Sequence, residues 1–69
     1  MKKIKKNNLE FFKVNDWIST LQIPPRPGQK YTIARVCKIL TKGKLLVEFG
    51  DYFDETIVEA KLCNLMRRE

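Results

Sequence analysis

The chain contains no histidine, a single serine and only two cysteines, and these shortages exclude several kinds of chemistry. Without histidine, neither a serine nor a cysteine nucleophile has an imidazole base to activate it. Cys37 and Cys63 are too few for a four-ligand zinc site or a disulfide scaffold. We therefore expect a protein that is not an enzyme and that carries no metal ion and no cofactor. Both cysteines are expected to pack as small apolar residues in strands.

Long apolar segments are also missing. No run approaches the roughly 20 residues that a membrane-spanning helix needs. The basic stretch 2–6 is followed by two asparagines and Glu10 instead of the apolar segment of a signal peptide. The three glycines stand singly, so there is no glycine-rich phosphate loop. These absences predict a soluble, cytoplasmic protein with reduced cysteines.

The 69 residues are enough for one small domain, and 43% of them are hydrophobic, which is too many for a disordered chain. A net charge of +6 favours polyanionic partners or acidic protein surfaces. The charges are unevenly distributed along the chain. Residues 22–47 contain six basic side chains and no acid, whereas residues 48–60 contain five acids and no base.

The apolar pattern predicts strands. Residues 29–40 and 44–49 alternate with a period of two and are separated by Gly43, which can adopt positive φ, so they predict a β-hairpin. Further strands are expected at 12–18, 56–58 and 63–67, with a helical or 3₁₀ turn at 59–62. Three prolines make 23–28 a loop, because they remove backbone donors.

One apolar core is expected from this pattern. Phe49→Ala should cost about 3–5 kcal/mol by leaving a cavity in it. The predicted core residues are Val14, Ile18, Ala34, Val36, Ile39, Leu45, Val47, Phe49, Val58, Leu62 and Leu65.

The order of these elements resembles the SH3-like small β-barrels, particularly the Tudor, chromo-barrel and KOW groups. The resemblance covers residues 12–67. It rests on Asn15-Asp16-Trp17-Ile18, where such barrels often have Gly-Asp-x-Val, on Ala34–Ile39 and Leu45–Phe49, and on Ile57, Leu62 and Leu65 at the closing end. It implies an all-β, five-stranded SH3-like barrel over 12–69, with a Pro-rich loop after the first strand and a 3₁₀ turn before the last. Residues 1–11 would form a basic tail or short turn.

Three kinds of binding are compatible with this reading. The first, which is the function that we expect, is binding to nucleic acid or a ribonucleoprotein surface through a basic hairpin and the loop before it, with exposed Tyr31 or Trp17 stacking a base. The residues expected to contact phosphates are Arg26, Lys30, Arg35, Lys38, Lys42 and Lys44.

The second kind is that of a phage-type inhibitor or accessory subunit, which binds a larger protein through a protruding apolar arm and a sheet edge. The arm would be formed by Leu21, Ile23, Pro24 and Pro25. Its alternative is that Leu21 and Ile23 fold back over one end of the barrel.

The third kind follows from the resemblance, because aromatic residues near these loops form a cage for methylated Lys or Arg in Tudor and chromo barrels. The corresponding residues here would be Trp17, Tyr31, Tyr52 and Phe53, with acids of the 51–55 segment at the rim.

Overall fold

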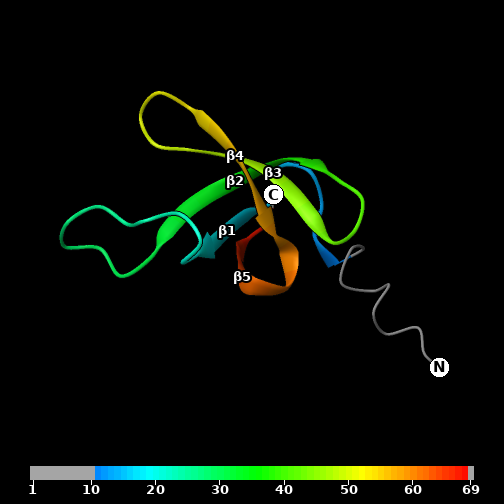
Figure 1. Cartoon of the computed structure of the whole chain (residues 1–69), viewed down its shortest axis with the longest axis horizontal. Coiled ribbons are helices and arrows are strands. Elements are labelled where there is room, and N and C mark those ends of the chain that lie inside the picture. The colour runs from blue at the N-terminus through cyan, green and yellow to red at the C-terminus, as the bar shows by residue number, and fades with distance from the viewer. Residues whose placement is uncertain (1–10, 69) are drawn as a thin grey trace.

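The computed structural model describes residues 11–68, which form a single antiparallel sheet. The strand order is β4-β3-β2-β1-β5, so the sheet is open and has β4 and β5 at its edges (Figure 1). The predicted all-β class and the five strands are confirmed, whereas the tail predicted at 1–11 lies almost wholly outside the described residues. The elements are β1 (Trp17–Thr20), β2 (Thr32–Ile39), β3 (Lys44–Phe49), β4 (Asp54–Glu59), the 3₁₀ turn η1 (Ala60–Leu62) and β5 (Cys63–Arg67).

The predicted hairpin is β2–β3, in which Ile39 lies opposite Leu45. Lys42 and Gly43 both have positive φ (60° and 74°), which is the conformation that tight hairpin turns require. The 3₁₀ turn and the last strand also lie where the sequence predicts them. β4 begins two residues before the predicted 56–58 strand, because Asp54 pairs with Phe49 and extends the ladder.

The first strand is shorter and later than predicted. Residues 13–16 form a turn, in which the Asp16 backbone N–H donates to the carbonyl of Lys13 over 3.1 Å. Asn15 adopts φ 81°, a left-handed conformation that asparagine tolerates better than most residues. Because the turn interrupts the period of two, the prediction of a strand over 12–18 is wrong.

The core is built from residues of β1, β2, β3 and β4, together with residues of the segments next to them. Most of the predicted core residues are buried there or pack against it, but Val14 and Leu62 are more than half exposed and were predicted wrongly. Phe49 is only partly buried at the edge of the cluster. The buried apolar residues are Phe12, Ile18, Ile23, Ala34, Val36, Leu45, Val47, Val58 and Ala60.

An ion pair between a buried aspartate and an exposed arginine ties the two ends of the described chain together. The side chain of Asp16 is 2% exposed and accepts hydrogen bonds from Arg68 Nε (2.9 Å) and Nη2 (2.7 Å). The backbone N–H of Lys13 donates to the same carboxylate (2.8 Å), and Arg68 also donates to the carbonyl of Phe11. The hydrogen bond from Arg68 is the main reason that the pKa of Asp16 lies below its ordinary value of 3.8.

A side-chain amide makes the corresponding link at the other end of β1. Gln22 Nε2 donates to the carbonyl of Glu59 (3.1 Å), and the backbone N–H of Glu59 donates to Gln22 Oε1 (2.7 Å). The same Nε2 also donates to the hydroxyl of Thr20 (2.9 Å). One amide therefore joins the end of β1 to the junction of β4 and η1.

These burial values change the expected cost of core truncations. Leu45 is fully buried, so Leu45→Ala should cost about 3 kcal/mol, whereas the half-buried Phe49 should cost roughly 2 kcal/mol or less when it is truncated to alanine. Urea denaturation of both variants measures this order. A larger loss for Phe49→Ala would contradict the position of the core.

The Asp16 ion pair predicts a specific pH dependence. Because folding lowers the pKa of Asp16, its contribution to stability is present above the ordinary pKa of 3.8 and is lost as the pH falls below that value. Asp16→Asn should therefore lower the free energy of unfolding by about 2 kcal/mol at neutral pH, where it removes hydrogen bonds to a charged group. The difference from wild type should shrink as the solution is acidified.

Asp54→Asn is the matched control for this experiment, because Asp54 is exposed and has no ion pair within residues 11–68. Its difference from wild type should stay small at every pH. An equal, pH-independent loss in both variants would rule out the proposed role of the buried carboxylate.

Candidate functional site

Two hollows of the surface meet at Tyr31, which lies just before β2. The first hollow, of about 470 Å³, lies between the end of β1, the connection 21–31 and β5; it is lined by Ser19, Thr20, Leu21, Gln22, Lys30, Tyr31, Leu62 and Asn64. The second, also about 470 Å³, lies between the same connection and the β3–β4 turn. The connection 21–31 and the β3–β4 turn project from the same side of the molecule, opposite the β2–β3 turn (Figure 1).

The second hollow combines aromatic and acidic side chains. Tyr31 contributes a ring from the residue before β2, Phe49 from the last residue of β3, and Tyr52 from the β3–β4 turn. Asp51 and Asp54 line the same hollow, together with Pro24, Arg26, Gln29, Thr32, Ile33 and Gly50. A volume of this size is within the range of sites that take a small molecule or a few side chains of a larger partner.

An exposed ion pair crosses the second hollow. Arg26, from the β1–β2 connection, lies 3.3 Å from the carboxylate of Asp51 in the β3–β4 turn. Both side chains are largely exposed, so the pair adds little stability and is open to competition by another charge. A cation of a bound partner can therefore replace Arg26 beside Asp51 at small cost.

Half of the predicted aromatic cage comes together. Tyr31 and Tyr52 line the second hollow, and Phe49, which was expected only in the core, joins them. Phe53 does not line it, although its side chain is exposed. Trp17 is half-buried on β1, away from this hollow, and its indole N–H has no hydrogen-bond partner within residues 11–68.

The predicted apolar arm is divided between surface and core. Leu21 is 73% exposed and lines the first hollow, and Pro24 lines the second. Ile23 is only 6% exposed and belongs to the core, so its predicted exposure for partner binding is wrong. It packs inward as the fold-back alternative expects. Pro25 is half-buried and lines neither hollow.

The predicted phosphate-binding residues extend along the whole length of β2. Arg26 and Lys30 precede this strand, whereas Lys42 and Lys44 lie at or after the turn that follows it. Eight residues of strand span about 26 Å, so the two pairs lie at opposite ends of the sheet. The structure therefore gives an extended row of cations in place of one compact patch.

Acids from residues 48–60 neutralise half of that row. Besides the Arg26–Asp51 pair, Arg35 Nε donates to Glu48 (2.8 Å) and Lys44 Nζ donates to Glu59 (3.1 Å). The hydrogen bond from Lys44 also lowers the pKa of Glu59. Within the described part of the chain, the other three residues of the row have no ion pair: Lys30, Lys38 and Lys42.

Several residues of these hollows were missed from the sequence. Leu62 was expected in the core and Asn64 was not singled out, yet both line the first hollow beside Leu21. Their place depends on the pairing of β1 with β5, which joins Thr20 to Cys63. The only sequence signal that could have located them was the turn predicted at 59–62, which indicates that the chain changes direction before β5.

Comparison with known proteins gives no further assignment, because the chain matches no family model, no curated protein and no solved structure. Among residues 11–68, no helix is long and apolar enough to cross a membrane.

Proposed function

We propose that the chain is a non-enzymatic binding module with an SH3-like arrangement of strands. The strand order β4-β3-β2-β1-β5, the 3₁₀ turn before β5 and the long connection between β1 and β2 support this arrangement. A non-enzymatic role is further supported by the composition, since the chain has no histidine that could activate a serine or cysteine nucleophile.

The partner that the geometry favours is a segment of another protein. The observation that carries this proposal is the meeting of the two hollows at Tyr31, between the connection 21–31 and its neighbours. Exposed apolar side chains such as Leu21 and Leu62 line one hollow, and two carboxylates line the other. An extended segment with an apolar side chain followed by a basic one would fill both. This is the accessory-subunit or inhibitor class of function.

The proposal predicts that Tyr31 is central to binding. Peptides selected by display on the wild-type protein should bind Tyr31→Ala about tenfold or more weakly, because an aromatic residue at the middle of an interface commonly contributes more than 1 kcal/mol. Fluorescence anisotropy of the selected peptides measures the change. The selected peptides should contain a basic residue. The double variant Asp51→Asn, Asp54→Asn should also bind these peptides more weakly than wild type does.

Ile57→Ala is the matched control, since Ile57 is an exposed apolar residue of β4 that lines neither hollow. Its affinity for the same peptides should equal that of wild type. Peptides that bind Tyr31→Ala normally but fail on Ile57→Ala would place the interface elsewhere and overturn the proposal.

Nucleic acid is the second candidate partner, and the unpaired lysines favour it. Lys38 and Lys42 are exposed and have no ion pair among residues 11–68, so they are available for phosphate contacts. Lys30 also lies beside Tyr31 at the first hollow, where a ring and a cation would suit a stacked base.

Salt dependence distinguishes this candidate. If phosphates are bound, Lys38→Ala and Lys42→Ala should each lower the slope of log K against log salt by about 0.7 on single strands or 0.9 on duplex. Lys44→Ala is the control and should change the slope less, because Glu59 already holds that cation. Titrations of random-sequence DNA and RNA at several salt concentrations give the slopes. If Lys38→Ala and Lys42→Ala keep the slope of wild type, a phosphate-binding row is excluded.

A further inference from the structure

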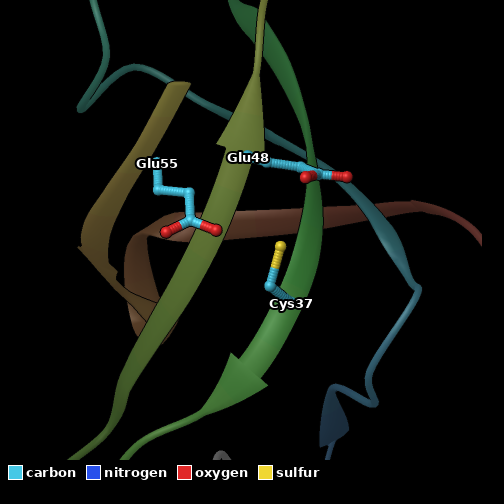
Figure 2. A group of neighbouring side chains, drawn as sticks. All are labelled: Cys37, Glu48 and Glu55. Atoms are coloured by element: carbon cyan, nitrogen blue, oxygen red, sulfur yellow. The ribbon is translucent and has the colours of Figure 1, made fainter. Parts of the chain in front are cut away.

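A mixed cluster of ligand-type side chains lies on the sheet, apart from both hollows. Cys37, Glu48 and Glu55 come from β2, β3 and β4, and one ligand atom of each lies within 4.8 Å of the other two. Figure 2 shows the thiol of Cys37 between the carboxylate of Glu55 on one side and that of Glu48 on the other. The three residues are far apart in sequence, so their spacing predicts no site.

The fold brings these side chains together by two departures from regular pairing. The register of the β2–β3 ladder shifts between Val36 and Lys38, which leaves Cys37 as the extra residue of a bulge. Bulges of this kind redirect a side chain and are common beside functional sites. Next to it, Glu48 lies directly opposite Glu55 in the β3–β4 ladder. Like charges in that position destabilise a sheet unless a positive charge lies between them.

One protein cation partly compensates the two carboxylates. Arg35 donates from Nε and Nη2 to the same oxygen of Glu48, Oε2. Glu55 has no ion pair within residues 11–68. The cluster therefore combines two carboxylates and a thiol with a single guanidinium, and it lacks about one positive charge.

We propose that Cys37, Glu48 and Glu55 bind a divalent transition-metal ion of the zinc type, with water completing the coordination. Thiolate favours such an ion over Mg²⁺ or Ca²⁺, and carboxylates are accepted beside it. Ligand atoms around a tetrahedral zinc ion lie about 3.5 Å apart, so the cluster must contract by roughly 1 Å. Glu55 is exposed and can rotate by that amount.

Binding exchanges a proton for the ion. A bond forms between Sγ of Cys37 and the metal, the S–H bond breaks, and the proton passes to solvent with no change of oxidation state. Because Arg35 occupies Oε2 of Glu48, the other oxygen is left for the metal, and the guanidinium orients the ligand from outside the coordination sphere. The proposal is independent of the partner that binds at Tyr31.

Cobalt(II) is a suitable probe, because a thiolate ligand gives it a charge-transfer absorption band that carboxylates alone do not give. Titration of the reduced, full-length protein with Co²⁺ should produce this band with saturation at one ion per chain, and Zn²⁺ should abolish it. Cys37→Ser should show no band, whereas Cys63→Ser, the matched control, should keep it. A missing band in wild type, or a band that follows Cys63, would overturn the proposal.

Carboxylate variants test the same site without altering the thiol. Glu55→Gln should weaken Co²⁺ binding about tenfold or more, and its exposure makes unfolding no explanation for the loss. Glu59→Gln makes the same chemical change further along β4 and should bind Co²⁺ as wild type does. Far-ultraviolet circular dichroism checks that each variant is folded. Equal affinities in wild type and Glu55→Gln would show an adventitious ion only and would reject the site.

Discussion

The side-chain amide of Gln22 satisfies both backbone polar groups of Glu59, and much of the candidate site depends on this link. In the sheet order, β4 and β1 are separated by two strands, so no ladder joins them. Gln22 joins them as a strand neighbour would, through one donor and one acceptor. The start of the connection 21–31 is thereby fixed beside η1, where Leu21 and Leu62 line one hollow. Without the amide, the partly buried backbone N–H of Glu59 would lose this acceptor, while its carbonyl would still accept from the thiol of Cys63.

The second organising feature is the pairing of opposite charges across neighbouring strands. Along the sequence the charge changes sign near residue 48, which suggests a molecule with two oppositely charged regions. Folding places the acidic β4 beside the basic hairpin, so that Lys44 meets Glu59. Within the hairpin itself, Arg35 on β2 meets Glu48 on β3. Two pairs of opposite charge therefore cross the sheet between neighbouring strands. Within residues 11–68, Lys30, Lys38 and Lys42 have no ion pair and add positive charge before β2, near its end and in the hairpin turn.

The parts of the fold that local patterns determine were predictable from the sequence. Alternating apolar residues and Gly43 identify the β2–β3 hairpin, because both signals act between near neighbours. Val14 was misplaced because the positive φ of Asn15 ends the alternation, and only the turn itself shows where the strand begins. Leu62 was misplaced because the 3₁₀ turn that contains it buries Ala60, its first residue, and leaves Leu62, its last, exposed.

The candidate site was predictable only in part, for a related physical reason. Tyr31 and Tyr52 could be selected as aromatic residues next to expected loops. Their separation from Phe53 and Trp17 depends on which way each loop turns, and this is set by tertiary packing. The cluster at Cys37 was not predictable, since it needs both a bulge and a particular strand register. The ion pairs between neighbouring strands depend on the strand register in the same way.

The strand order has a consequence for how the chain folds. β2, β3 and β4 are joined by short turns, whereas the pairing of β1 with β5 brings Ile18 to Leu65. Closing a long loop costs more chain entropy than closing a turn, so the three-strand meander can form first from neighbouring contacts. The ladder between β1 and β5 then forms on a chain that is already partly ordered. Because Ser19, Thr20 and Asn64 of that ladder line the first hollow, this hollow is completed at the end of folding.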